Sequence, residues 1–107
     1  MKRKYKIVYS PKSIDDLRSI YMYICNVLEA DGTAKKQISR IRDCIKRLDT
    51  LPERHEVVEW EPWSLIGMRK FPVDNYIVFY LVNRTDKVVT IVRILYGGQD
   101  INRQLDQ

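Results

Sequence analysis

The chain has 107 residues and a mass of 12.8 kDa, which suffices for one domain with a single modest core and excludes a second independent domain. Hydrophobic residues make up 45% and charged residues 31%, with four glycines and four prolines, so a disordered, collagen-like or low-complexity chain is excluded. Nineteen lysines and arginines against 14 aspartates and glutamates give a net charge of +5, which favours an acidic partner.

The first predicted element is a short strand over Tyr5–Tyr9, because β-branched and aromatic residues are typical of strands. Ser10 and Pro11 then predict a helix start, since serine is a good cap and proline is tolerated at the first helical position. Asp15 and Asp16 suit the positive end of the helix dipole.

Apolar residues at three- and four-residue steps predict two helices in succession. Gly32 is expected to end the first helix and Thr33 to cap the second, which Pro52 stops. Helices joined by so short a link must run antiparallel, so the sequence predicts a helical hairpin. Its two stripes are Ile14, Leu17, Ile20, Tyr21, Ile24 and Leu28, then Ile38, Ile41, Ile45, Leu48 and Leu51.

Three strands are predicted next, over Leu65–Phe71, Tyr76–Asn83 and Val88–Tyr96. The links Pro72–Asn75 and Arg84–Lys87 are short enough for hairpins, so these strands should form an antiparallel meander. The middle strand is apolar on both faces and should be central.

A polar tail over residues 99–107 should form a last helical turn. The resulting order β-α-α-β-β-β predicts an α+β fold, with a helical hairpin packed on a twisted, mainly antiparallel four-stranded sheet. In the last strand Arg93 is expected to share a face with Ile91 and Leu95, an exception to the apolar pattern. Residues 1–107 should form this one domain.

The sequence lacks the motifs that metal and nucleotide cofactors require. There is no glycine-rich phosphate loop, no metal-binding motif and a single histidine, His55, so we expect no cofactor and no metal. Cys25 and Cys44 are expected to be small buried apolar residues. Since no apolar run reaches the length of a signal peptide or membrane span, we expect a cytoplasmic protein without membrane contact.

The charge is segregated along the chain. Basic residues crowd the first strand, and an acidic stretch in mid-chain argues against a surface that nucleic acid coats uniformly. The basic group is Lys2, Arg3, Lys4 and Lys6, and the acidic group is Glu53, Glu56, Glu59 and Glu61.

The candidate catalytic or target-binding residues lie on the last three strands. Arg69, Lys70 and Arg93 are cations that can hold a phosphate or stabilise a charged transition state. Only one of the consecutive Arg69 and Lys70 can share a face with Arg93, and the sequence leaves open which. An alternative is that Arg93 pairs with a carboxylate and that the other two are solubilising charges on an edge strand.

Aromatic residues offer further candidates. Tyr80 and Tyr96, with Tyr76 beside them, could stack on a base or donate a proton, although tyrosines in strands usually serve packing. Trp60 and Trp63 are expected to close one end of the core, with a partner-binding anchor as the alternative.

The stretch from Gly67 to Ile101 resembles the C-terminal half of the RelE/ParE toxins of bacterial type II toxin–antitoxin modules. The opening strand and the two helices match the layout of the same family. The matching residues are Gly67 and Arg69, then Tyr76, Phe79 and Tyr80, then Val89, Ile91, Arg93, Ile94, Leu95 and Gly97.

The resemblance is closer to the ParE-like branch. Where RelE-type nucleases carry basic residues and a C-terminal tyrosine, this chain has Ile77, Gly98–Gln99 and Leu105, and Lys70 is the clearest basic residue that remains. The run Arg93–Asp100 is nearer ParE, although Gln99 stands where many members have arginine.

The resemblance implies a toxin with roles in growth inhibition and plasmid stabilization, which acts on DNA gyrase. Two alternatives stay open: a ribosome-dependent mRNA endonuclease, in which the candidate cations and tyrosines would be catalytic, and a degenerate toxin that binds only its antitoxin. The antitoxin should be acidic and partly disordered, and should lay a helix into an apolar groove to form a hetero-oligomer.

Overall fold

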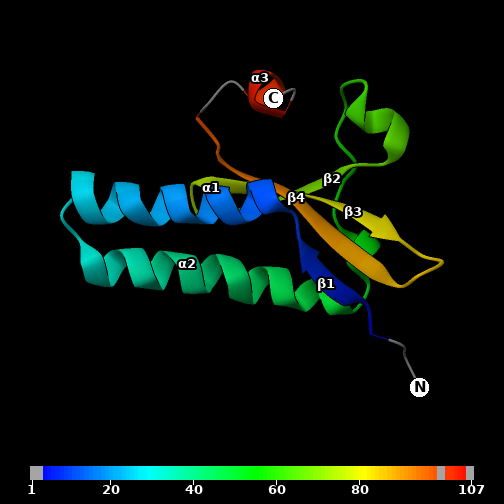
Figure 1. Cartoon of the computed structure of the whole chain (residues 1–107). Coiled ribbons are helices and arrows are strands. Elements are labelled where there is room, and N and C mark those ends of the chain that lie inside the picture. Colours follow the sequence, from blue (N-terminus) through cyan, green and yellow to red (C-terminus); the bar gives the residue numbers. More distant parts are fainter. Residues whose placement is uncertain (1–3, 99–100, 106–107) are drawn as a thin grey trace.

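The computed structural model describes residues 4–98 and 101–105, which form a four-stranded sheet with a helical hairpin on one face (Figure 1). Lys2, Arg3, Gln99 and Asp100 lie outside the described residues. None of the described helices is long and apolar enough to cross a membrane. The elements are β1 (Lys6–Tyr9), α1 (Pro11–Met22), a π-helical segment (Tyr23–Val27), α2 (Asp31–Lys46), 3-10 turns (Arg47–Asp49, Pro52–Arg54, Trp63–Ile66), β2 (Arg69–Val73), β3 (Tyr76–Asn83), β4 (Val88–Tyr96) and α3 (Ile101–Leu105).

The strand order is β1-β4-β3-β2, and β1 runs parallel to β4 while the other pairs are antiparallel. The predicted meander, the bounds of β3 and β4 and the central place of β3 are confirmed. Both predicted ends of the preceding strand, Leu65 and Phe71, are wrong, because Leu65 and Ile66 belong to a 3-10 turn and the strand continues through Pro72 to Val73. That turn ends at Gly67, whose φ of 74° lies in the left-handed region that favours glycine.

The helix start at Ser10 is confirmed: the Ser13 amide donates to Ser10 Oγ at 3.1 Å. The link between the helices differs from the prediction, since α2 already begins at Asp31 and Gly32 lies within it. The chain instead reverses at Glu29, which takes a left-handed φ of 51°. Gly32 therefore does not end the first helix, and Thr33 does not cap the second.

Both faces of β3 are buried, as predicted. Its even-numbered residues Val78 and Tyr80 pack under the two helices, and Phe79 packs into a second cluster on the opposite face. The predicted last helical turn is confirmed by α3, and Leu105 at the end of this helix is buried in the second cluster. The expected role of Trp60 and Trp63 in closing the core is confirmed, because both pack on this cluster; its buried members are Val58, Met68, Phe79, Leu95 and Leu105.

A β-bulge in β4 changes which residues share a face. Arg93 lies opposite Phe79 but Ile91 lies opposite Tyr80, which leaves Val92 as an extra residue. Ile91 consequently packs under the helices and Leu95 on the opposite face. The expectation that both residues share the face of Arg93 is confirmed for Leu95 and wrong for Ile91, because the extra residue reverses the alternation between Ile91 and Arg93.

Candidate functional site

Arg93 forms a bidentate ion pair with Asp16 of α1. Its Nε donates to Oδ2 at 2.8 Å and its Nη2 to Oδ1 at 2.9 Å, while Nη1 donates to the carbonyl oxygen of Gln104 at 2.8 Å. Each side chain of the pair is 12% exposed. The hydrogen bonds that Arg93 donates to the Asp16 carboxylate raise the pKa of Arg93 above its ordinary value. Arg93 therefore joins β4 to α1 and α3, in agreement with the carboxylate-paired alternative.

Asp16 also binds the backbone of β4 where the pairing with β1 has ended. The Ile94 amide donates to Asp16 Oδ2 at 2.9 Å, and Ser10 Oγ donates to the Val92 carbonyl oxygen at 2.8 Å. These side chains of the α1 segment satisfy β4 backbone groups beyond the end of β1. The expected role of Asp16 at the helix dipole is wrong, because no acidic residue lies in the first turn of α1.

Arg69 faces the segment that precedes its own strand. Its Nη1 donates to the carbonyl oxygens of Glu53 at 3.1 Å and His55 at 2.6 Å, and its Nη2 lies 3.6 Å from Glu53 Oε2. The Glu53 carboxylate also accepts from Arg84 Nε at 2.9 Å, and this bond lowers the pKa of Glu53. The Arg69 guanidinium is therefore engaged in holding residues 53–55 on β2.

Lys70, and not Arg69, shares the face of Arg93, because Lys70, Phe79 and Arg93 lie in one row across the sheet. Strand β3 separates the two cations, so their backbones lie roughly 10 Å apart. The Lys70 Nζ is 3.6 Å from Glu56 Oε1 and 5.1 Å from the centroid of the Trp60 ring. The structure thus places Lys70 and Arg93 on one face without direct contact.

The two candidate tyrosines occupy opposite environments. Tyr80 is fully buried and its Oη donates to the Pro52 carbonyl oxygen at 2.6 Å. Burial raises the pKa of Tyr80 to about 12. Tyr96 is 50% exposed and its ring centroid lies 6.0 Å from that of Tyr76. Of the two, Tyr96 is accessible to a base or a partner side chain in this conformation.

His55 and Lys70 line a shared cavity of about 600 Å³ at the edge of β2. The imidazole stacks on Phe71 with ring centroids 4.5 Å apart. Burial, followed by the charges of Arg54 and Arg69, lowers the pKa of His55. In residues 4–98 and 101–105 no group of three or more His, Cys, Asp or Glu side chains could hold a metal ion.

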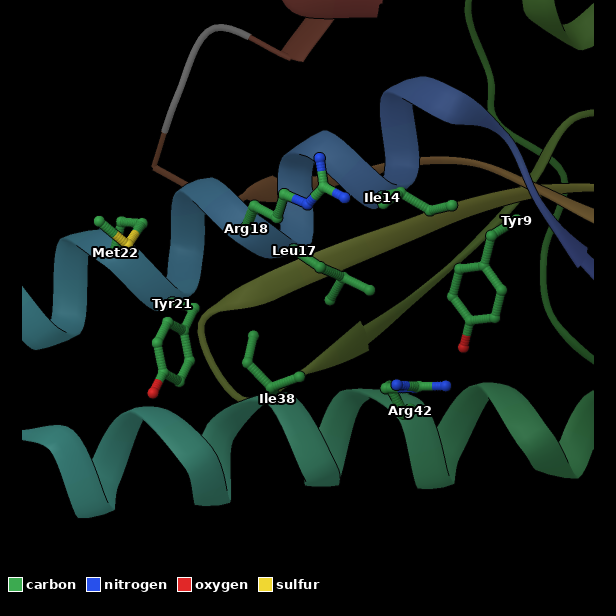
Figure 2. A pocket seen from close by; sticks show the side chains of 8 residues that line it. All are labelled: Tyr9, Ile14, Leu17, Arg18, Tyr21, Met22, Ile38 and Arg42. Atoms are coloured by element: carbon green, nitrogen blue, oxygen red, sulfur yellow. The ribbon is translucent and has the colours of Figure 1, made fainter.

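An apolar groove of about 480 Å³ lies between α1 and α2, where Leu17 and Tyr21 face Ile38 across the hairpin (Figure 2). Helical periodicity predicted these residues as core, and only the packing of the helices shows that a groove remains open. Two of the lining residues, Arg42 and Tyr9, contact each other, with Arg42 Cζ 5.9 Å from the centroid of the Tyr9 ring. The complete lining is Tyr9, Ile14, Leu17, Arg18, Tyr21, Met22, Ile38 and Arg42.

The fold and the site define a small α+β protein. Its helical hairpin carries an apolar groove, and the cations on its sheet are bound to groups of the protein itself. A family model described as the ParE toxin of type II toxin–antitoxin systems, parDE, matches residues 7–101. The chain belongs to this ParE toxin family. A comparison with curated protein sequences gives no match.

Solved structures share the fold. A chain of the chromosomal ParDE toxin–antitoxin system from P. aeruginosa is 21% identical, with a TM-score of 0.71 over 89% of this chain and 98% of that chain. A chain of a RelBE toxin–antitoxin complex from Mycobacterium tuberculosis is 16% identical, with a TM-score of 0.64 over 87% and 98%. A mutant of the E. coli toxin RelE in the free state is 10% identical, with a TM-score of 0.65 over 94% and 92%.

Proposed function

We propose that this ParE-type toxin inhibits bacterial growth by acting on DNA gyrase in the cytoplasm, and that an antitoxin bound to the helical hairpin holds it inactive. The toxin would act by binding its target and not by cleaving RNA. Membership of the ParE family supports this proposal over ribosome-dependent mRNA cleavage.

The observation that carries the choice is the engagement of the three candidate cations. Arg93 is bound to Asp16, Arg69 is bound to backbone carbonyls, and Lys70 lies beside a carboxylate and an indole ring. A nuclease needs cations preorganised toward the phosphate whose charge develops in the transition state. Internal pairing of this kind favours a positioning role for Arg69, Arg93 and the buried Tyr80.

In this proposal Lys70 and Tyr96 are the candidates that contact the target. The Lys70 side chain is 26% exposed and opens to the cavity it shares with His55, and Tyr96 is half exposed at the end of β4. Tyrosine is a frequent anchor in protein interfaces, and the charge of Lys70 can attract acidic groups of the target.

The groove between α1 and α2 is the proposed seat of the antitoxin. Its lining is apolar except for Arg18 and Arg42, and Ile14 and Met22 are 41% and 53% exposed. An amphipathic helix would bury its apolar face in such a groove, and acidic residues beside that face would meet the two arginines. The partner is therefore proposed to be acidic, and the toxin and antitoxin to form a hetero-oligomer.

Gyrase supercoiling and DNA-cleavage assays with the purified chain test the proposal. We expect loss of supercoiling or accumulation of cleaved DNA, and relief of either effect by the cognate antitoxin. Primer extension on a reporter mRNA during cell-free translation, with and without ribosomes, is the parallel measurement. New ribosome-dependent mRNA ends together with unaffected gyrase would overturn the gyrase target and establish the nuclease alternative.

A further inference from the structure

The positive charge of the chain concentrates at one end of the molecule. This end, which we call the basic end, combines the start of β1, the β3–β4 turn, the C-terminal end of α2 and the 3-10 turns Arg47–Asp49 and Pro52–Arg54 that follow α2. The first three of these segments lie together in Figure 1. Its cations are Lys4, Lys6, Lys46, Arg47, Arg54, Arg84 and Lys87, and its carboxylates are Asp43, Asp49, Glu53 and Asp86.

Hydrogen bonds join these segments. The Lys6 amide donates to the Lys87 carbonyl oxygen at 2.8 Å, and the Tyr5 amide donates to the Asp49 carbonyl oxygen at 2.8 Å. The Arg54 guanidinium donates to the Arg47 carbonyl oxygen at 2.8 Å. The segments that carry these cations therefore lie side by side at one end of the molecule.

Three of the four carboxylates at this end, all except Asp43, are already engaged. Asp49 lies 3.8 Å from Lys4, Asp86 bonds to Asn83, and Glu53 pairs with Arg84 and Arg69. Five cations of the basic end have no carboxylate within 4.0 Å among the described residues, namely Lys6, Lys46, Arg47, Arg54 and Lys87. The surface thus presents an excess of positive charge that the protein itself does not neutralise.

We propose that the basic end binds the phosphate backbone of duplex DNA. Closely grouped lysines and arginines bind nucleic acid by displacing counterions from its phosphates. Proteins that prefer single strands add exposed aromatic rings that stack on bases. At this end Tyr5 is half-buried, with Lys87 Nζ 4.9 Å from its ring centroid, and Tyr96 lies at the other end of β4. Phosphate contact without base stacking is the mode that suits a duplex.

This inference goes beyond the proposed action on gyrase, because it requires only the charge and placement of the basic end. Binding to DNA can be measured in the absence of gyrase, and inhibition of gyrase can be measured with a variant that lacks cations of the basic end. A failure of either proposal therefore leaves the other one testable.

A matched pair of double variants tests the site. Lys6→Gln/Arg47→Gln removes two exposed cations from the basic end, and Lys35→Gln/Lys36→Gln removes two exposed cations near the start of α2. Both variants have the same net charge. Lys35 and Arg47 are separated by about 18 Å along the helix axis, at 1.5 Å per residue.

Fluorescence anisotropy with a labelled 30-base-pair duplex, between 50 and 300 mM salt, gives the Kd and its salt dependence. If all five unpaired cations contact phosphates, log K falls with log salt with a slope of about −4.5. The Lys6→Gln/Arg47→Gln variant should reduce the size of that slope by about 1.8 and weaken binding by on the order of tenfold or more at 100 mM salt. The Lys35→Gln/Lys36→Gln variant should bind as the unmodified chain does.

Four results would overturn the proposal: no binding at 50 mM salt, equal weakening in both variants, tighter binding to the single strand or to an RNA of the same length, or equal competition by a polyglutamate chain of equal charge. Circular dichroism spectra that match the unmodified chain show that each variant is folded.

Discussion

Removing the carboxylate of Asp16 should destabilise the protein more than any nearby surface change. In Asp16→Ala, Arg93 keeps its charge in a site where its side chain is 12% exposed, and the Ile94 amide loses its acceptor. Breaking one partner out of a buried ion pair costs about 3–5 kcal/mol, and an unpaired buried amide costs about 1–3 kcal/mol. Because the Gln104 carbonyl still accepts from Arg93, we expect a total of about 3–5 kcal/mol.

A double-mutant cycle isolates the pair. Arg93→Met leaves the Asp16 carboxylate without its cation, whereas Asp16→Ala/Arg93→Met leaves no unpaired charge. The double variant should therefore be at least about 1 kcal/mol more stable than additive losses would make it. Asp15→Ala is the matched control. The Asp15 side chain is 72% exposed, and its single ion pair, with Arg18 at 3.8 Å, is a weak surface contact. The change in the free energy of unfolding should therefore stay within about 0.5 kcal/mol.

Urea unfolding followed by circular dichroism, with linear extrapolation to water, measures these free energies. A loss below about 1 kcal/mol in Asp16→Ala, or strict additivity in the double variant, would refute the view that this pair joins α1 to β4. A loss of 3–5 kcal/mol is a large part of the 5–15 kcal/mol that stabilises an ordinary domain, so growth assays of these variants need a parallel measurement of folded protein.

Three further outcomes follow from the site. Tyr80→Phe leaves the Pro52 carbonyl oxygen without its donor and should cost about 1–2 kcal/mol in urea unfolding, and an unchanged midpoint would contradict the role of this hydrogen bond. Burial lowers the pKa of His55 below 6.5, so the unfolded chain takes up the proton first and the free energy of unfolding falls as the pH drops through 6.5. His55→Phe should remove this fall between pH 7 and 5. If the variant keeps the fall, another group is responsible for it. Arg18→Glu should lower the affinity of the toxin for its antitoxin about tenfold, as measured by calorimetry at low salt; an unchanged affinity would argue against the groove as the antitoxin-binding site.

Local signals were sufficient for much of the fold. Ser10 caps α1 as its residue type predicts, and the apolar runs with short hairpin links set the bounds of β3 and β4. The reversal between the helices was missed because it uses a left-handed Glu29, a conformation for which the sequence offers glycine more plainly at Gly32. The parallel pairing of β1 with β4 depends on contacts more than 80 residues apart, and no local pattern encodes it.

By itself the sequence determined the order of the elements, the two-sided burial of β3 and the residue types from which a site could be built. The faces and partners of those residues depended on the tertiary structure. The bulge at Val92 reversed the alternation along β4, and the docking of α1 brought Asp16 to Arg93 across 77 residues. Strand and helix periodicities are local properties of the chain, whereas register, charge pairing and an open groove arise only when distant segments pack together.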